Sequence, residues 1–251
     1  RFWKAELDKS GSGYAVIRFL PAVDDDKTAF VRVFNHGFQG PGGWYIENSL
    51  TTIGQKDPLS EYNSVLWNSG IEANKEIARK QKRRLTYFSN IYVVEDKANP
   101  QNEGKVFLFR FGKKIFDKIS SMSNPEFEDE TEVDVFNLWD GANFKLKIRK
   151  VDGFSNYDKS EFMTSAPLSE DESEMESVFG QQHDLEEFID QKSFKTYDEL
   201  KTRLDTVLGN IQTPAMTAPT SVENDEAPFD GGTPIPESST SEDENLDYFK
   251  K

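Results

Sequence analysis

The feature that most constrains the fold is a sharp change of composition near residue 210. From Ile211 to the end, the chain is rich in Pro, Ser, Thr, Asp, Glu and Gly and has almost no apolar periodicity. Such a segment cannot bury enough apolar surface to offset the entropy lost on ordering. We therefore expect residues 211–251 to form a disordered acidic tail, and the fold to be built from the residues before it.

Charge is distributed unevenly along the chain, whose formal net charge is -15. Residues 1–160 hold 24 Lys and Arg against 23 Asp and Glu, whereas residues 161–251 hold 6 against 22. This asymmetry indicates a body that faces nucleic acid and carries an acidic C-terminal part.

The sequence gives three indications of where the protein is located. No stretch approaches the roughly 20 apolar residues of a membrane span, and the first residues form no signal peptide. The chain has no Cys, which excludes disulfides, thiolate zinc sites and thiol catalysis. We expect a soluble, intracellular protein.

Six apolar runs with a period of two residues predict short strands. These runs are Tyr14–Leu20, Phe30–Phe34, Trp44–Ile46, Leu85–Val94, Lys105–Phe111 and Phe144–Val151. Clusters of Gly, Pro, Asn and Ser separate them, which is typical of turns. The pattern favours a small β-barrel over a parallel α/β sheet.

Helices are predicted at three places. Residues 60–81 have helix-forming composition with a break at 68–70, and a short helix is expected after Gly112. Thr196 and Glu199 form a capping-box pattern before a leucine stripe that ends at Gly209. The predicted fold class is therefore α+β, mainly β with helices.

A run of cations leads directly into a group of aromatic residues. The cations are Lys75, Arg79, Lys80, Lys82, Arg83 and Arg84, and the rings are Tyr87, Phe88 and Tyr92. Lys and Arg neutralise phosphates, and aromatic faces stack on bases of any sequence. A solvated helix end followed by a core strand is the alternative, but the interleaved charge and rings favour a groove for single-stranded nucleic acid.

A second cluster combines phenylalanines with basic residues. Phe107, Phe109 and Phe111 share one face of a predicted strand, Arg110 lies on the other, and Lys113 and Lys114 follow. A barrel buries one face of each strand, so each of these rings is either a core residue or a base contact.

Two further rings lie outside the predicted strands. Phe154 and Tyr157 occupy a loop, where a ring is harder to bury, and they are better stacking candidates than strand residues. By contrast, Lys145, Lys147 and Arg149 alternate with apolar residues and indicate a solvated strand face.

Signals of catalysis or metal binding are weak. Gly11 and Gly13 lack the third glycine of a dinucleotide motif, and Gly112 with Lys113 lacks the rest of a P-loop. His36 and His183 lie in unlike contexts without a paired nucleophile. The acidic run at 126–134 lacks the glycine and alternation of a calcium loop. We expect no enzymatic activity.

Six segments, in order and with compatible spacing, resemble the single-stranded DNA-binding, helix-destabilising protein of T-even-type bacteriophages. They are Ala15–Pro21, Asn35–Phe38, Gly43–Glu47, Asn102–Phe107, Arg110–Ile115 and Gly153–Asp158. The resemblance runs from about Phe2 to about Leu208. It implies a five-stranded OB-fold-like core at 1–165 with a helical insertion at about 58–83, a C-terminal helical part at 166–210, and the tail at 211–251.

The resemblance also implies site residues. Combined with the patterns above, it predicts nucleic-acid contacts at Arg18, Lys80, Lys82, Arg83, Arg84, Tyr87, Phe88, Tyr92, Phe109, Arg110, Lys113, Lys114, Phe154 and Tyr157. The family's zinc site uses one His and three Cys. His36 fits the His position, but Ser49, Leu59 and Tyr62 occupy the Cys positions. We therefore expect no zinc and no other cofactor.

The leading hypothesis is a sequence-tolerant single-stranded DNA-binding protein that coats and protects DNA in phage replication, recombination and repair, in the cytoplasm of an infected bacterium. The resemblance implies that the acidic tail contacts replication and recombination proteins. It also implies self-association on DNA through a basic arm. That arm would precede Arg1, so self-association is left undecided by this sequence. An RNA-binding regulator and a protein-interaction scaffold are the alternatives.

Overall fold

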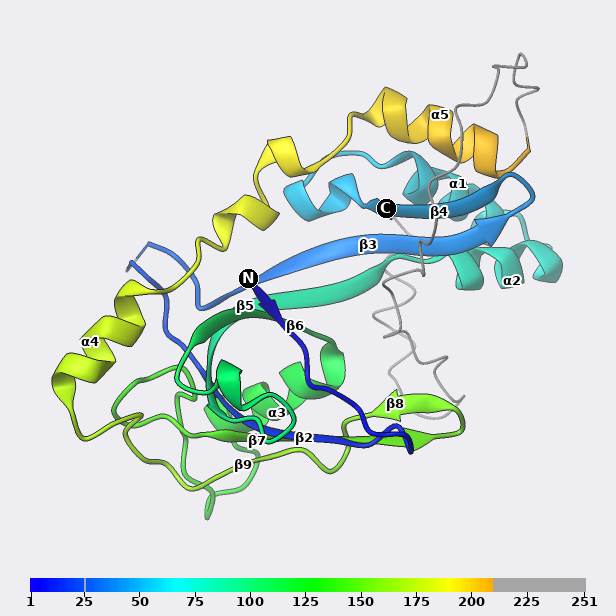
Figure 1. The fold of residues 1–251 in the computed structure, drawn as a ribbon. Coiled ribbons are helices and arrows are strands. Elements are labelled where there is room, and N and C mark those ends of the chain that lie inside the picture. Colours follow the sequence, from blue (N-terminus) through cyan, green and yellow to red (C-terminus); the bar gives the residue numbers. More distant parts are fainter. Residues whose placement is uncertain (25, 210–251) are drawn as a thin grey trace. The chain divides into compact units, whose positions relative to one another are not determined.

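The computed structural model describes residues 1–24 and 26–209, so the expected acidic tail lies outside the described residues (Figure 1). Nine strands, five α-helices and four short 3-10 turns form within this part of the chain. The chain divides into two compact units. Among the described residues, unit 1 comprises Arg1–Arg32 and Thr86–Ile189, and unit 2 comprises Val33–Leu85 and residues 190–209.

Unit 1 is built on a mostly antiparallel sheet. Its strand order is β1-β6-β5-β2-β7-β8, and β9 also pairs with β7. The bounds are β1 Phe2–Trp3, β2 Gly13–Phe19, β5 Arg84–Glu95, β6 Val106–Phe111, β7 Phe144–Val151, β8 Phe154–Asn156 and β9 Glu161–Phe162. β5 begins with the last two residues of the unit 2 segment and then enters unit 1.

The core of unit 1 is aromatic. Phe19 of β2 is fully buried, and its ring centroid lies 5.5 Å from that of Phe111 and 5.8 Å from that of Phe144. Aromatic pairs with centroids 4.5–7 Å apart are favourable beyond the apolar area that they bury. Helix α3 (Lys113–Ser123) adds Ile115 and Ile119, which are one turn apart and both buried. The fourth helix, α4, spans Glu172–Gly180.

β3 (Phe30–Gly40) begins with the last three residues of the first unit 1 segment, and within unit 2 it forms an antiparallel hairpin with β4 (Gly43–Asn48). Helix α5 (Tyr197–Val207) packs closely on its turn. A Cβ at Gly40 would lie 2.4 Å from the Val207 carbonyl oxygen, and one at Gly42 would lie 2.0 Å from that of Thr206. Both glycines are therefore required by close backbone approach.

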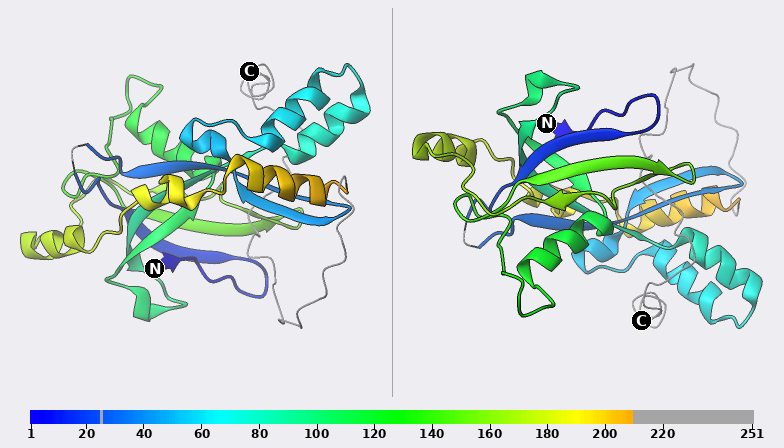
Figure 2. Two further views of the ribbon diagram at one scale, coloured as in Figure 1. Left: turned by 90° about the horizontal axis from the view of Figure 1, so that it is seen from above. Right: turned by 90° about the horizontal axis from the view of Figure 1, so that it is seen from below.

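Two antiparallel helices complete unit 2 and lie side by side in both views of Figure 2. They are α1 (Pro58–Asn68) and α2 (Glu72–Gln81), and a 3-10 turn, η1 (Leu50–Ile53), precedes them. The turn between the helices uses Gly70 at a φ of 75°, a conformation that favours glycine. Leu59 of α1 and Leu200 and Leu204 of α5 are buried in one apolar cluster with Tyr45.

The predicted elements are largely confirmed. Each of the six predicted strands overlaps an observed one, the 60–81 region forms two helices with a break at the expected place, and a helix follows Gly112. The capping box of Thr196 and Glu199 is present, and Gly209 adopts a φ of 76° after α5. The α+β class is confirmed.

Other elements were not predicted. β1, β8 and β9 contain only two or three residues, too few to show a period, and α4 lies in an acidic region with a weak apolar pattern. The pairings among the described strands also do not close into the expected five-stranded barrel. Within the described ranges, no helix is long and apolar enough to cross a membrane.

Candidate nucleic-acid interface

The basic segment Lys80–Arg84 in unit 2 is where helix α2 ends and β5 begins. Lys80 lies in the last helical turn, and the backbone becomes extended at Lys82, which has a ψ of 148°. Lys80 and Arg84 are exposed, whereas Lys82 and Arg83 are half-buried. Partial burial lowers the pKa of Lys82. Four cations within five residues form a concentrated positive site for phosphates.

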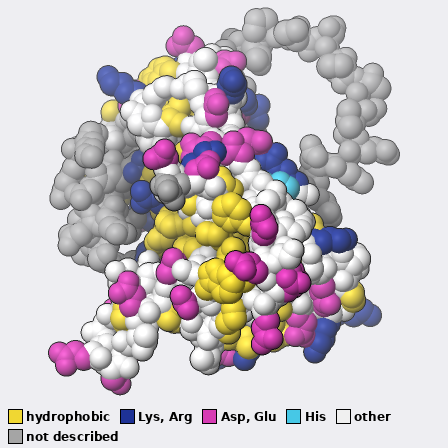
Figure 3. All heavy atoms as spheres, turned by 90° about the vertical axis from the view of Figure 1, so that its left-hand side faces the viewer, with side chains coloured by type: hydrophobic (Ala, Val, Ile, Leu, Met, Phe, Trp, Pro, Cys, Tyr) yellow, Lys and Arg dark blue, Asp and Glu magenta, His cyan; other side chains and the backbone are white. Residues whose placement is uncertain are grey.

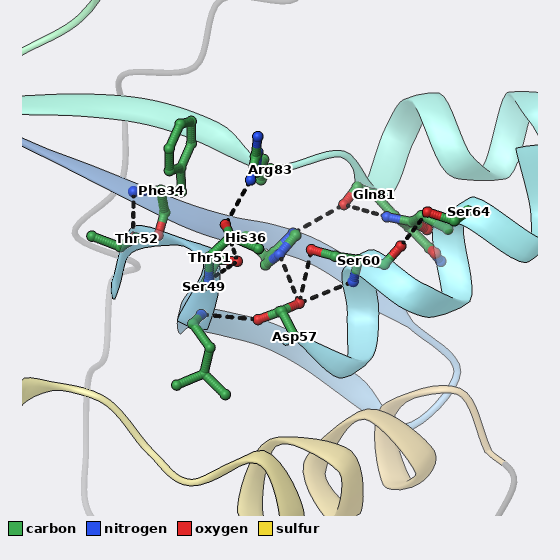
Figure 4. Close-up of polar contacts among 12 residues, drawn as sticks. Phe34, His36, Ser49, Thr51, Thr52, Asp57, Ser60, Ser64, Gln81 and Arg83 are labelled. Atoms are coloured by element: carbon green, nitrogen blue, oxygen red, sulfur yellow. Dashed lines mark hydrogen bonds and ion pairs between the residues drawn. The ribbon is translucent and has the colours of Figure 1, made fainter. Parts of the chain in front are cut away.

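Arg83 is held in one orientation by the elements around it. Its Nη1 donates a hydrogen bond to Thr51 Oγ1 (2.7 Å), and its guanidinium carbon lies 4.0 Å from the centroid of the Phe34 ring (Figure 4). Thr51 Oγ1 is also 2.9 Å from the hydroxyl of buried Ser49. A planar guanidinium held this way is suited to binding phosphate oxygens with little loss of entropy.

The earlier cations of α2 are engaged on the helix itself. Arg79 forms ion pairs with Glu72 and Glu76, and Lys75 pairs with Glu72 at 3.8 Å. The Arg79 guanidinium also lies 5.3 Å from the ring centroid of Trp67. The structure thus separates these helix-surface cations from the basic segment that follows.

In unit 1, the structure brings Arg110, Lys114 and Tyr157 together. Lys114, in the first turn of α3, donates to Asn156 Oδ1 at 3.4 Å. Desolvation lowers the pKa of Arg110, and the nearby phenol of Tyr157 acts in the opposite direction. We call Arg110, Lys114 and Tyr157 the unit 1 surface. It combines two cations with one half-buried ring.

The β8 hairpin positions the rings that were predicted to lie in a loop. Phe154 is the first residue of β8 and is 37% exposed, and Tyr157 follows the strand directly. Arg149 of β7 donates to both carboxylate oxygens of Asp158, at 2.9 and 2.5 Å. This contact lowers the pKa of Asp158 to about 2. Arg149 therefore braces the turn that carries Tyr157.

Lys113 lies next to the unit 1 surface in the sequence but pairs with Asp117, one turn further along α3, at 2.8 Å. Both side chains are exposed. Exposed pairs of this kind contribute little to stability, so Lys113 remains available to exchange partners.

Three predicted contact residues lie in the interior of unit 1, whereas the prediction assumed accessible side chains. Tyr87 is 4% exposed and stacks on Phe116 with centroids 4.2 Å apart, and Phe109 is 5% exposed among core rings. Arg18 is fully buried. Each of these side chains lies on the buried face of its strand. The period-two pattern shows that a strand has two faces but does not show which one is buried.

Arg18 has a structural role instead. Its Nη2 donates to the carbonyl oxygens of Asn137 (2.7 Å) and Ala166 (3.0 Å), and its Nη1 donates to Asn143 Oδ1 (3.3 Å). Burial lowers the pKa of Arg18 to about 10, so the group stays charged at neutral pH. The guanidinium thus ties loop carbonyls to β2.

Phe88 and Tyr92 are half-buried and engaged within unit 1. The Phe88 ring stacks on Phe188 with centroids 4.4 Å apart and planes at 5°. The Tyr92 hydroxyl lies 3.3 Å from Glu174 Oε1. Both side chains are less exposed than that of Phe154.

Some exposed rings were not predicted from the sequence. Trp139 is 50% exposed and Phe127 is 66% exposed, and both lie in the segment between α3 and β7. Figure 3 shows hydrophobic side chains gathered on one face of the molecule. The criterion that selected Phe154, an aromatic residue outside a strand, would also have found Trp139.

The residues at the family's metal positions do not fit a zinc site. Ser49 offers a hydroxyl that caps η1, Leu59 is fully buried in the apolar cluster, and Tyr62 packs against the same cluster. His36 instead faces Asp57, with Nε2 and Oδ1 3.3 Å apart. Across residues 1–24 and 26–209, no group of three or more His, Cys, Asp or Glu side chains could hold a metal ion. Zn²⁺ binds well to Cys thiolates and His imidazoles, but these positions offer one imidazole and no thiolate.

Comparison of the sequence with known proteins identifies the family. The model of the family described as gp32 DNA binding protein like matches residues 11–208. A single-stranded DNA-binding protein of Enterobacteria phage T2 is 47% identical over 214 residues, which are 82% of this chain and 70% of the relative. The protein of the same name from Enterobacteria phage T4 is 46% identical over the same shares.

Both relatives are named as DNA-binding proteins and not as enzymes, in agreement with the expectation of no catalytic site. The family indicated by the six ordered segments is confirmed, since the matching model spans most of the chain and the relatives are covered over more than two thirds of their length. The chain belongs to the gp32 DNA binding protein like family of phage proteins.

Proposed function

We propose that this protein binds single-stranded DNA without sequence preference. The observation that carries the proposal is the basic segment Lys80–Arg84, in which Arg83 is held by Thr51 and Phe34. Phosphate contacts hold a strand without reading its bases, which gives sequence-tolerant binding. The relatives' names, single-stranded DNA-binding protein, support this reading.

The unit 1 surface and Phe154 would supply contacts of a second kind. Arg110 and Lys114 neutralise phosphates, with Lys113 beside them, while Tyr157 and Phe154 offer faces for bases. Stacking of a base on an aromatic ring contributes about 1–3 kcal/mol and tolerates any base. We propose that the antiparallel sheet of unit 1 is the OB-fold-like platform for these contacts.

The test is a fluorescence titration with a single-stranded DNA oligomer at several salt concentrations, beside an RNA oligomer of matched sequence. We expect tighter binding to DNA, and a log-log salt slope of about -0.7 per neutralised phosphate. Tighter binding to RNA would favour an RNA-binding regulator. No binding to either oligomer would favour a protein-interaction scaffold.

We further propose the biological setting that the family suggests. The protein would coat and protect DNA strands during phage replication, recombination and repair, in the cytoplasm of the infected bacterium. The acidic segment after residue 210 would recruit replication and recombination proteins, and copies of the chain would associate on DNA. Deleting residues 211–251 should abolish capture of such proteins, and it should strengthen single-stranded DNA binding at low salt because the acidic segment no longer competes with DNA. Capture that survives the deletion would place the partner-binding surface in the folded part.

A further inference from the structure

A buried contact between a histidine and an aspartate lies in unit 2. His36 of β3 and Asp57, the residue before α1, have fully buried side chains, and His36 Nε2 lies 3.3 Å from Asp57 Oδ1. A buried charge is stable only when its remaining hydrogen-bonding positions are also satisfied. The other partners of these two residues therefore determine what the pair does.

Asp57 is satisfied by backbone and hydroxyl donors. Its Oδ2 accepts from the backbone N–H of Leu50 (3.1 Å), and its Oδ1 accepts from the N–H (2.9 Å) and hydroxyl (3.1 Å) of Ser60. Burial by itself would raise the pKa of Asp57, but the contact with His36 and these donors outweigh it and lower the pKa to about 2. The carboxylate is thus a fixed anion that anchors the imidazole ring.

The other ring nitrogen of His36 points to the end of α2. His36 Nδ1 lies 3.2 Å from the carbonyl oxygen of Gln81, which also accepts a hydrogen bond from Asn63 Nδ2 at 3.1 Å (Figure 4). A carbonyl oxygen only accepts, so the ring nitrogen that faces it carries the proton. Gln81 is the last residue of α2, and its carbonyl carbon is bonded to the nitrogen of Lys82.

We propose that His36 is a positioning residue for DNA binding. It holds the Gln81 carbonyl by donating from Nδ1, and it thereby sets where the backbone leaves α2 and presents Lys82, Arg83 and Arg84. Asp57 fixes the orientation of the ring. This inference rests on the proposed function of the basic segment. It gives His36, at a position where the family carries a metal ligand, a task that requires no metal.

Two substitutions at position 36 separate positioning from folding. His36→Asn keeps an amide nitrogen at the branch position of Nδ1 but cannot reach Asp57. His36→Gln places an amide nitrogen one bond further out, nearer the position of Nε2, and loses the contact with Gln81. Leaving the Asp57 charge unpaired is the more costly loss for the fold. His36→Asn should therefore have the lower melting temperature.

DNA affinity should follow the opposite order. We expect His36→Gln to bind single-stranded DNA about 5–10-fold more weakly than wild type, the effect of one lost hydrogen bond, and His36→Asn to bind within about twofold. Both variants are titrated well below their melting temperatures. A purely structural role would make affinity follow melting temperature, and that outcome, or equal affinities, would overturn the proposal.

A third variant tests the proposal even if both substitutions at position 36 prevent folding. Asn63→Ala removes the second donor to the Gln81 carbonyl without touching Asp57, and it should also weaken DNA binding. Asp205→Asn, which breaks the exposed pair with Lys201 on α5, is the control and should bind as wild type does. Normal binding by a folded Asn63→Ala variant would contradict the positioning role.

The same substitutions in an Arg83→Ala background distinguish the two proposals. If His36 acts through the basic segment, His36→Gln should add little to the loss already caused by Arg83→Ala, because coupled residues are not additive. Fully additive losses would show that His36 does not act through Arg83. If Arg83→Ala itself leaves affinity and salt slope unchanged, the proposed DNA-binding role of the segment fails first.

Discussion

The guanidinium carbon of Arg83 lies 4.0 Å from the centroid of the Phe34 ring, while its Nη1 donates to Thr51 Oγ1 at 2.7 Å. A cation over a ring face is attracted by the ring quadrupole, and the hydroxyl sets the rotation of the guanidinium plane. Arg83 therefore keeps one orientation before any strand arrives, which reduces the entropy lost on binding.

Replacing Arg83 and Arg84 together with Ala should weaken binding to all sequences about equally. Phosphate contacts carry no base information, so the salt slope should fall by about 1–2 while base preference stays unchanged. The measurement is a salt series with two oligomers of different sequence. A variant with Lys192 and Lys201 changed to Ala removes equal charge elsewhere and should keep the slope of wild type. An unchanged slope in the Arg83, Arg84 variant would place these residues outside the interface.

Tyr157→Ala should cost about 1–3 kcal/mol of DNA binding, because the ring would no longer stack on a base. The melting temperature should change little, since Tyr157 is only half-buried and lies after the short strand β8. Titration and thermal unfolding are measured on the same sample. Tyr14→Ala, at an exposed position on β2, is the matched control. A large fall in melting temperature would instead assign Tyr157 to packing.

Arg18→Met should damage folding and not binding. The substitution leaves the buried carbonyl oxygens of Asn137 and Ala166 without their charged donor, at a cost of about 3 kcal/mol or more. Denaturant unfolding would measure this loss, and DNA titration at low temperature would report on the folded protein. Selective loss of DNA affinity with normal stability would restore Arg18 to the interface.

Acid should remove the stability that Asp57 supplies. The pKa of Asp57 is about 2 in the folded state against 3.8 for an unperturbed aspartate, so its contribution is complete above about pH 4 and is lost as the pH falls toward 2. A difference of this size corresponds to about 2 kcal/mol. Unfolding free energies of wild type and Asp57→Asn, measured from pH 6 downward, should converge. A gap that stays constant to the lowest pH would contradict the depressed pKa.

Removing metal should have no effect. We expect purified protein to contain no stoichiometric zinc, and a chelator to leave its melting temperature unchanged, because His36 faces Asp57 and the three family Cys positions hold Ser49, Leu59 and Tyr62. The checks are metal analysis by mass spectrometry and thermal unfolding with and without chelator. One zinc per chain would refute this prediction.

Local patterns were sufficient for most elements. Period-two alternation identified β2, β5, β6 and β7, and the Thr196 capping box identified α5, because strand alternation and helix capping involve residues close together in the sequence. Six ordered motifs were sufficient for the family. The basic segment was also visible, since its cations are consecutive.

Only the tertiary structure decided which side of each strand is buried. Tyr87 and Phe109 lie in strands whose period-two pattern is compatible with either an exposed or a buried face, and both are buried. The sequence pattern predicts a surface cation at Arg18, but Arg18 donates to carbonyl oxygens more than 100 residues away in the sequence. Burial depends on contacts between distant segments, which a local period cannot encode. For the same reason, the pairing of His36 with Asp57 and the orientation of Arg83 on Phe34 became visible only once β3, α1 and the end of α2 were placed together.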